Sequence, residues 1–432
     1  MDSDYDSEVY ADNLSEISDI GNLHDFDSDS DSDNDDLFRT RRNRVMPILS
    51  SDSEESGDEC PSWLPVESDR TPVIEPFVGN SGVSAIPYIR SVIDIVKLFI
   101  GDDLIEHMAI ETNRYHMQNL NRLSTGGKSI KWKDVTGKDI KKMLGLLLLM
   151  GRVRKDTRDE YWSTEETIST PFFAKIMSRD RFRQIWSSWH FANNEQDVIE
   201  NDRLSKVRPI INYLLPKFRI VYKPERELSL DESVMPWRGR LSFKVYNASK
   251  IVKYGILIRM VCEAKSGYIC NLKIYCGNGN SLQSTILDIL EPYLNLWHHV
   301  YMDNFYNSVN TSLLLLQNKT RICGTIRTNR GLPEELKNLK LKRGETVFRR
   351  RQEVLLQCWQ SKRIVQMIST IHSAAMVESH NIEWKTREKI WKPICVIDYN
   401  KYMSGVDRAD QYLSYFSIVR RTKKWTKRMV ID

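Results

Sequence analysis

Two aspartates directly follow short segments that have the pattern of β-strands. Asp231 comes after the alternating residues 228–230, and Asp303 comes after the apolar run 299–302. Alternation and short apolar runs both predict strands, so each acid is expected at a strand end. If the two strands are neighbours in one sheet, their carboxylates lie at the same edge of it.

A third acid, Asp407, lies in the segment 403–411. Gly405 permits a tight entry into a helix there, and Asp410 falls on the same helical face as Asp407. Carboxylate oxygens are ligands that Mg²⁺ prefers, and three acids on separate elements match a two-metal site for phosphoryl transfer. Spacing alone leaves an alternative, in which each acid is an ordinary solvated surface charge.

The elements around these acids predict the fold that must position them. After the strand at 228–230 come two β-rich runs, a helical pattern, a strand, a helix and another strand. Their ranges are 244–262 (interrupted near Asn247), 268–276, 282–294, 299–302, 309–316 and 321–325. Three strands, helix, strand, helix and strand is the outline of an RNase H-like α/β core.

Residues 88–220 carry apolar residues at helical spacing and therefore predict a helical region before the core. Four tryptophans in this region, Trp132, Trp162, Trp186 and Trp189, are interpreted as core residues. Large aromatic side chains in helical segments usually pack inside a domain.

The formal net charge of +5 hides a strong asymmetry. Residues 1–60 hold 19 Asp and Glu and four Arg, a net charge of −15. Residues 61–432 carry 59 Lys and Arg against 39 Asp and Glu, a net charge of +20. A basic body has a polyanion as its natural partner, and an acidic tail can compete for the same surface. The tail has few apolar anchors, which predicts that it is disordered.

Two short motifs in the tail have functional interpretations of low specificity. Residues 51–55 fit either an acidophilic kinase site or a plain solvated tail. Arg39, Arg41, Arg42 and Arg44 have the composition of a nuclear import signal, although groups this short occur often by chance. We expect a nuclear location.

The composition also argues against several classes of protein. The longest apolar run, around residues 146–150, is far shorter than the roughly 20 residues that a membrane-spanning helix needs. Seven scattered cysteines form no CxxC pair and suit a reducing compartment. No phosphate-binding GxxxxGK[ST] loop is present, so no nucleotide cofactor is expected.

Three basic segments are candidate contacts to DNA. Residues 233–262 contain no acid, residues 337–351 hold seven basic residues against one Glu, and residues 419–432 are basic around Trp425. Phosphates attract Lys and Arg, whereas the neighbouring aromatic residues either stack on bases or pack inward. The residues selected as DNA contacts are Arg238, Arg240, Lys244, Lys250, Lys253, Arg420, Arg421, Lys423 and Lys424.

Several short motifs occur in the order found in one transposase family. They include Ser229-Leu230-Asp231-Glu232-Ser233, Met302-Asp303-Asn304-Phe305-Tyr306 and Gly405-Val406-Asp407-Arg408-Ala409-Asp410-Gln411, preceded by Thr112-Asn113-Arg114-Tyr115 and Tyr161-Trp162-Ser163-Thr164. Each motif alone is modest, but the ordered set is specific. Over residues 77–432 the chain resembles the piggyBac transposases and piggyBac-derived proteins.

This resemblance implies an RNase H-like DDE core with an insertion before the third acid. It implies that Asp231, Asp303 and Asp407 form the catalytic triad and bind Mg²⁺, with Asp410 as a nearby metal-binding acid. It further implies a homodimer that acts on double-stranded DNA. The implied reaction is excision of TTAA-flanked transposon ends by hydrolysis, hairpin formation and strand transfer.

The chain departs from the family pattern in two places. Where the family commonly has Trp-x-Asp in the insertion, this sequence reads Trp359-Gln360-Ser361. Beyond the position of Trp425 the family continues through further helices and a cysteine-rich zinc module. We expect that module to be absent here, which would weaken end recognition and dimer assembly.

Two hypotheses therefore stand at the level of the sequence. The first is a piggyBac-like, Mg²⁺-dependent enzyme of DNA cleavage and strand transfer, and the second is a domesticated nuclear DNA-binding protein without catalysis. The predicted parts are an acidic tail and linker (1–76), a helical domain (77–225), the first part of the core (226–325), the insertion (326–390) and the completion of the core, truncated after the third acid (391–432).

Overall fold

The computed structural model describes residues 46–47, 63, 72–84, 91–120, 131–195, 202–248, 252–277, 281–382, 389–415, 417–418 and 422–432. Most of the tail predicted over 1–76 lies outside the described residues, together with its arginine cluster and its candidate kinase site. Of the selected DNA contacts, Lys250, Arg420 and Arg421 also lie outside them.

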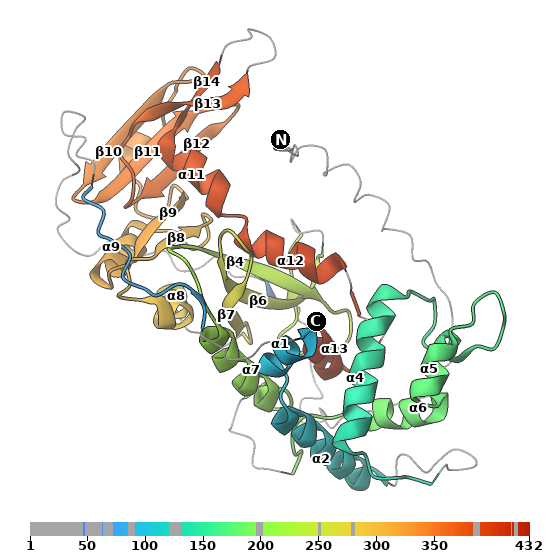
Figure 1. Cartoon of the computed structure of the whole chain (residues 1–432). Helices are drawn as coiled ribbons and strands as arrows, with labels where there is room; N and C mark the ends of the chain where they lie inside the picture. The colour runs from blue at the N-terminus through green and yellow to red at the C-terminus, as the bar shows by residue number, and fades with distance from the viewer. Residues whose placement is uncertain are drawn as a thin grey trace. The chain divides into compact units, whose positions relative to one another are not determined.

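A group of helices precedes the central sheet (Figure 1). Their common core includes Trp186 and Trp189, and Trp132 and Trp162 pack against it, which confirms the interpretation of these four residues. The elements are α1 (Val92–Phe99), α2 (Asp102–Gln118), α4 (Gly137–Arg152), the 3₁₀ helix η4 (Asp159–Trp162), α5 (Pro171–Ile176), α6 (Arg179–Ser188) and α7 (Arg208–Val221).

The start of α4 shows how local sequence sets a helix boundary. Thr136 Oγ1 accepts a hydrogen bond from the Asp139 amide (3.3 Å), and the Thr136 amide donates to Asp139 Oδ2 (3.1 Å). This capping box satisfies donors that the first turn of a helix leaves without partners. Asp139 also forms a 3.0 Å ion pair with Arg181, which links α4 to α6.

The residues after α7 form an RNase H-like core, as predicted. Strands β7, β6, β4, β8 and β9 are neighbours in that order, with β6 antiparallel to β7 and β4, and with β8 parallel to β4 and β9. Helix α8 connects β7 to β8, and α9 connects β8 to β9. The elements are β4 (Glu227–Pro236), β6 (Tyr254–Glu263), β7 (Ile269–Ile274), α8 (Leu282–Leu290), β8 (His299–Met302), α9 (Val309–Gln317) and β9 (Arg321–Thr325).

Strand β4 is longer than its sequence pattern predicts. The strand was expected to end at Asp231, but it continues to Pro236 because this side of β4 stays paired with β6 as far as Pro236↔Gly255. Pairing with β8 ends much earlier, at Leu230↔Met302. Asp231 is therefore still paired with β6 on one side of β4. On the other side it lies one residue beyond the last residue that pairs with β8.

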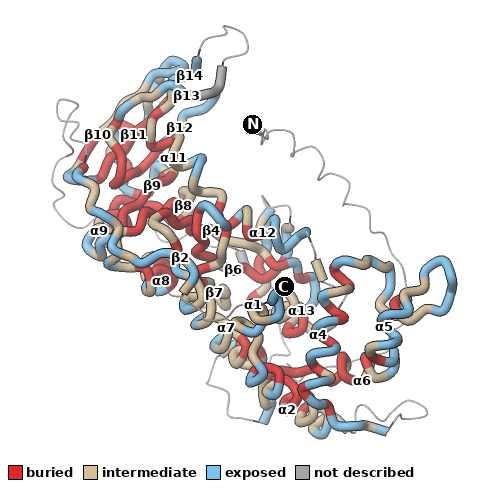
Figure 2. Tube along the Cα trace, in the orientation of Figure 1, coloured by how far each residue is buried: buried red, intermediate tan, exposed pale blue. Residues whose placement is uncertain are grey.

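The predicted insertion adds strands to the core sheet. Strand β12 pairs antiparallel with β9, and β11 and β10 follow outward in the same sheet. Buried residues run through these strands and through the core strands beside them (Figure 2). The elements are α10 (Glu334–Lys337), β10 (Thr346–Arg351), β11 (Val354–Gln360), β12 (Ile364–Ser369), and a separate pair, β13 (Met376–Ile382) and β14 (Lys389–Pro393).

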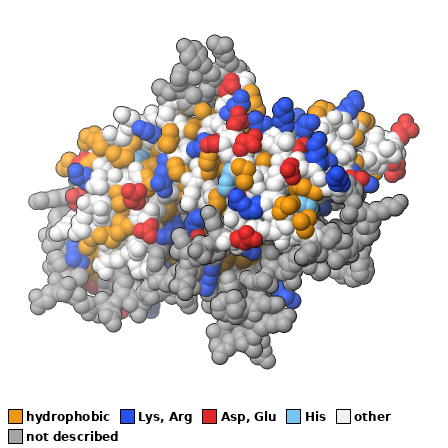
Figure 3. Space-filling model, turned by 90° about the horizontal axis from the view of Figure 1, so that it is seen from below, with side chains coloured by type: hydrophobic (Ala, Val, Ile, Leu, Met, Phe, Trp, Pro, Cys, Tyr) orange, Lys and Arg blue, Asp and Glu red, His pale blue; other side chains and the backbone are white. Residues whose placement is uncertain are grey.

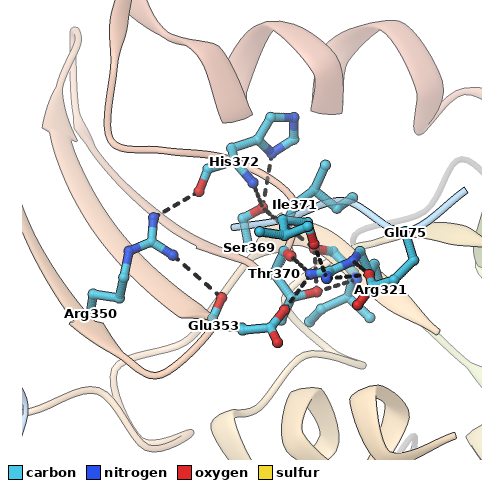
Figure 4. Close-up of polar contacts among 10 residues, drawn as sticks. Glu75, Arg321, Arg350, Glu353, Ser369, Thr370, Ile371 and His372 are labelled. Carbon is cyan, nitrogen blue, oxygen red and sulfur yellow. Dashed lines mark hydrogen bonds and ion pairs between the residues drawn. The ribbon is translucent and has the colours of Figure 1, made fainter. Parts of the chain in front are cut away.

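Arg321, at the start of β9, joins the insertion to the segment before the helical region (Figure 4). Its side chain is 1% exposed and forms ion pairs with Glu75 (2.5 Å) and Glu353 (2.7 Å). The guanidinium also donates to the carbonyls of Val73 (2.8 Å) and Thr370. A buried guanidinium needs such partners, since an unpaired buried charge is costly.

Three α-helices, one 3₁₀ helix and several short strands complete the described part of the chain. No helix among the described residues is both long enough and apolar enough to cross a membrane. The elements are β1 (Met46–Pro47), β5 (Val245–Tyr246), β2 (Gly82–Val83) paired with β3 (Tyr222–Lys223), the 3₁₀ helix η5 (Glu291–Tyr293), α11 (Ile394–Tyr402), α12 (Gly405–Tyr415) and α13 (Trp425–Ile431).

Candidate active site

Asp231 and Asp303 occupy matching positions on two neighbouring parallel strands. The last register pair between β4 and β8 is Leu230↔Met302, so the next residue on each strand is one of these aspartates. Neighbouring strands lie about 4.8 Å apart. Because successive side chains alternate between the faces of a sheet, both carboxylates belong to the face opposite Leu230 and Met302. The sequence prediction that the two acids meet is consistent with this register.

The turn after Asp303 is held by its own side chain and by a buried asparagine. Asp303 Oδ1 accepts a hydrogen bond from the Phe305 amide (2.8 Å). Asn307 Nδ2 donates to the carbonyls of Met302 (2.8 Å), Asp303 (3.1 Å) and Thr325 (2.9 Å). Asn307 was not singled out from the sequence, although it follows the Met302 to Tyr306 motif directly. The three hydrogen bonds of Asn307 fix the backbone around Asp303.

The environment of Asp303 makes its negative charge unfavourable without a cation. Burial raises the pKa of Asp303, and the nearby Glu232 carboxylate acts in the same direction. Burial raises the pKa of the Tyr399 hydroxyl in α11, and the charges of Asp303 and Asp231 act in the same direction. Such a carboxylate site attracts positive charge.

Helix α12 covers the face of the sheet that carries Asp231. Gly405 lies so close to β4 that a Cβ atom there would collide with Ser229 Oγ, which explains the glycine at the entry of the helix. Further along α12, Asp410 Oδ1 accepts a 2.7 Å hydrogen bond from Ser233 Oγ of β4. Ser233 and Asp231 are two residues apart on β4 and so share a face. This bond places Asp410 over the strand that carries Asp231.

Asp407, the third acid of the predicted triad, is exposed on α12. Asp410, one turn further along, is only partly exposed and contacts β4. Among the residues that the structure describes, no group of three or more His, Cys, Asp or Glu side chains is close enough to hold a metal ion. The structure thus pairs Asp231 with Asp303 by register and brings Asp410 closer to β4 than Asp407.

Glu232, the residue after Asp231, has its side chain on the opposite face of the sheet. Glu232 Oε2 accepts a 2.9 Å hydrogen bond from the buried Tyr306 hydroxyl, and Arg259 is its partner across the β4–β6 ladder. Burial raises the pKa of Tyr306, followed by the effect of the Glu232 charge. Glu232 therefore supports the turn after β8 and does not join Asp231.

The acids near the end of the β4–β8 ladder have the donor chemistry of a Mg²⁺ site, but the described residues do not bring three of them into one cluster. Asp231, Asp303 and Asp410 offer carboxylate oxygens on one face of the sheet. A thiol lies near them, because burial and then the charges of Asp410 and Asp231 raise the pKa of Cys262. Hard divalent cations prefer carboxylate oxygens and keep some of their waters.

We name the acid-free segment 233–262, which runs from β4 through β5 to β6, the basic hairpin. The selected basic residues on it fall into two groups. Arg238, Arg240 and Lys253 are exposed. Lys244 is instead half-buried and donates to the carbonyls of Gly239 (3.1 Å) and Arg238 (3.4 Å). On the face seen in Figure 3, Lys and Arg side chains are interspersed with acidic and hydrophobic ones. The three exposed residues stay candidate contacts to DNA.

The C-terminal basic run is divided in the same way. Lys423 is exposed, whereas Lys424 Nζ donates to the Tyr115 hydroxyl (2.8 Å) and lies 4.5 Å from the ring centre. Lys427 is 2% exposed and donates to the carbonyls of Trp186 and Ser187 at the end of α6. The structure gives Lys424 a contact inside the chain, which joins the end of the chain to α2.

A serine, a histidine and an aspartate also form a chain of hydrogen bonds near the insertion. Ser369 Oγ contacts His372 Nδ1 (2.8 Å), and His372 Nε2 contacts Asp398 Oδ2 (2.8 Å). Ser369 is completely buried and its oxygen accepts from the amides of Ile371 and His372. A nucleophile must reach its substrate. The arrangement therefore joins β12 to α11 and is not a hydrolase triad.

Comparisons with known proteins agree with the fold. The family described as Transposase IS4 matches residues 93–432. Human PiggyBac transposable element-derived protein 2 is 28% identical over 359 residues, covering 78% of this chain and 58% of that protein. Human PiggyBac transposable element-derived protein 5 is 22% identical over 400 residues, covering 86% of this chain and 74% of that protein.

A solved structure shows the same architecture. One chain of a piggyBac transposase synaptic complex with hairpin DNA superimposes with a TM-score of 0.70 and 26% identity, over 82% of this chain and 75% of that one. The chain spans 58% of the length of human PiggyBac transposable element-derived proteins 2 and 3.

Proposed function

Because the chain belongs to the piggyBac-type Transposase IS4 family, we propose that it binds double-stranded DNA and cleaves and joins it with Mg²⁺ at TTAA sequences. The observation that carries this proposal is the register of Asp231 and Asp303 at the end of the β4–β8 ladder. Further support comes from the solved relative, which is a synaptic complex with hairpin DNA. We also propose a nuclear location and a homodimer, as the family resemblance implies.

In this proposal each residue has a separate task. Asp231 and Asp303 hold the metal from two adjacent strands, and the turn that Asn307 fixes keeps Asp303 in place. Helix α12 supplies the third acid, either Asp407 or Asp410. Mg²⁺ would activate the attacking oxygen and stabilise charge on the leaving oxygen of the phosphodiester. The exposed residues Arg238, Arg240 and Lys253 would hold the DNA backbone.

A second candidate function is DNA binding without catalysis. The exposure of Asp407, with no group of three possible ligands among the described residues, favours it. Under this alternative α12 does not bring a third carboxylate to the pair. The two candidates predict the same affinity for DNA and differ only in cleavage.

The experiment uses a library of labelled duplexes with a central TTAA and randomised flanks, since the terminal sequences are unknown. The protein is incubated with the library and Mg²⁺, and the ends of nicked strands are sequenced. Nicks concentrated at TTAA are expected from the natural chain. Asp303→Asn should reduce them by more than about a hundredfold, because loss of a metal ligand costs at least as much as loss of an outer partner.

The matched control is Asp288→Asn, the same change at an exposed acid of α8 that pairs with Lys273 (2.6 Å). It should leave nicking unchanged, and all three proteins should bind the library equally. Binding without nicking in the natural chain would replace the enzyme with the second candidate. Absence of binding would contradict both.

A further inference from the structure

Strand β1 connects the acidic tail to the body of the protein at a defined place. β1 pairs in parallel with β5 (Met46↔Val245, Pro47↔Tyr246), and β5 pairs with β6 (Tyr246↔Tyr254). The run 27–36, which consists only of Asp, Ser and Asn, ends ten residues before Met46. The acidic run therefore lies ten residues along the chain from a strand that pairs with β5.

The surface beside β5 is basic and aromatic, and we name it the β5–β6 surface. It comprises Arg238, Arg240, Tyr246, Lys253 and Tyr254, all of which are exposed. The two tyrosine rings are 39% and 42% exposed and lie 4.7 Å apart. No Asp or Glu occurs between Ser233 and Cys262. A polyanion at this surface meets no acidic side chain from the hairpin itself.

We propose that the acidic segment 25–36 of this same chain binds the β5–β6 surface and competes there with DNA. The inference rests on the proposed function for the DNA part, but not for the contact between segment and surface. The segment carries seven Asp and no Lys or Arg. Its carboxylates carry closely spaced negative charges along the sequence, as the phosphates of DNA do.

The length of the connection favours this contact. A ten-residue connection with the statistics of a random coil has a root-mean-square span of roughly 16–19 Å. Such a tether gives an effective concentration on the order of millimolar. A contact with a dissociation constant of about 0.1 mM would then be mostly formed, although the same peptide free in solution would bind weakly.

Four arginines in the connection, Arg39, Arg41, Arg42 and Arg44, carry the same sign of charge as the surface. They reduce the net attraction of the tail but leave it acidic, since residues 1–44 hold 14 Asp and Glu. The contact is therefore local and electrostatic, and raising the salt concentration should weaken it.

The first test changes the tail in the full chain and keeps its length. The seven Asp of segment 25–36 are replaced by Asn, and the affinity for a labelled duplex is measured by fluorescence anisotropy. At low salt the variant should bind DNA about tenfold more tightly than the natural chain, because the competing segment no longer occupies the surface. The difference should shrink as salt rises. Equal affinities at low salt would overturn the proposal.

The second test needs no DNA. A labelled peptide of residues 22–37 is titrated against the full chain that carries the seven Asn. Binding is expected, and it should be lost in Arg238→Ala/Arg240→Ala/Lys253→Ala. The matched control is Lys175→Ala/Lys362→Ala/Arg363→Ala, which removes three exposed charges elsewhere and should keep the binding.

The outcomes separate this inference from the proposed function. Peptide binding that depends on the β5–β6 surface supports the inference even if the protein never binds DNA. No peptide binding, or equal loss in both triple variants, overturns it even if DNA binding is strong. A peptide in which the same seven Asp are Asn must not bind, and binding of that peptide would also overturn it.

Discussion

Ser233 Oγ donates a 2.7 Å hydrogen bond to Asp410 Oδ1, and this bond joins strand β4 to helix α12 two residues beyond Asp231. It is a contact between residues 177 positions apart in the chain. Its consequence is that the helix carrying the third acid is held to the strand carrying the first. The insertion lies between these two elements in sequence, so the bond also closes the core around it.

Ser233→Ala should lower the free energy of unfolding by about 1 kcal/mol, because a partly buried carboxylate loses its hydrogen-bond donor. Urea denaturation measures this change. A double-mutant cycle with Asp410→Asn should give a coupling of similar size. Ser242→Ala, at an exposed serine of the basic hairpin, is the matched control and should stay within about 0.5 kcal/mol of the natural chain. Additive single effects would show that the bond does not hold α12.

Arg238→Ala/Arg240→Ala should weaken DNA binding uniformly across sequences and lower its dependence on salt. Each contact to a phosphate contributes about 0.9 to the slope of log K against log salt, so the slope should fall by roughly 1.8. Fluorescence anisotropy between 50 mM and about 200 mM salt measures the slope. An unchanged slope would place the DNA elsewhere on the molecule.

Lys424→Met and Lys423→Met should separate structure from DNA contact in the C-terminal run. Lys424 Nζ bonds to the Tyr115 hydroxyl, so its replacement should cost about 1 kcal/mol of stability and leave the salt slope unchanged. Lys423 is exposed, so its replacement should cost less stability than that of Lys424 and lower the slope by about 0.9. Thermal unfolding and the anisotropy titration together test the pair, and the opposite pattern would contradict the assignment.

Asp398 should make the stability of the protein depend on acid pH. Burial acts to raise the pKa of Asp398, but the hydrogen bond from His372 and the positive charges of His372 and Lys401 together outweigh it and hold that pKa below its usual range. A carboxyl group with a lowered folded-state pKa stabilises the fold above its unfolded-state pKa, about 3.9, and this contribution is lost as pH falls through the folded-state value.

The measurement is the free energy of unfolding of the natural chain and of Asp398→Asn between about pH 7 and pH 3. At pH 7 the variant should be less stable by about 1 kcal/mol. Below about pH 4 the difference should shrink, and the two should converge only as pH falls through the lowered folded-state pKa, since both then carry an uncharged group at this position. A difference that stays constant over the whole range would mean that the charge of Asp398 contributes nothing.

The sequence determined the elements of the core and their order. Alternation and apolar runs are local properties, and they predicted β8 at His299–Met302 and β9 at Arg321–Thr325 without error at either end. The same kind of pattern misplaced the end of β4, because a strand ends where its partner ends, and its partner β6 lies about twenty residues further along the chain.

Only the tertiary structure decided which side chains share a face and which charges are used inside the protein. The adjacent acids Asp231 and Glu232 look alike in sequence, yet the sheet sends them to opposite faces. Lys423 and Lys424 are adjacent cations, but Lys424 is half-buried and bonds to Tyr115 of α2, whereas Lys423 is exposed. These outcomes depend on contacts between residues that are distant in sequence, and such contacts arise from packing that local pattern does not encode.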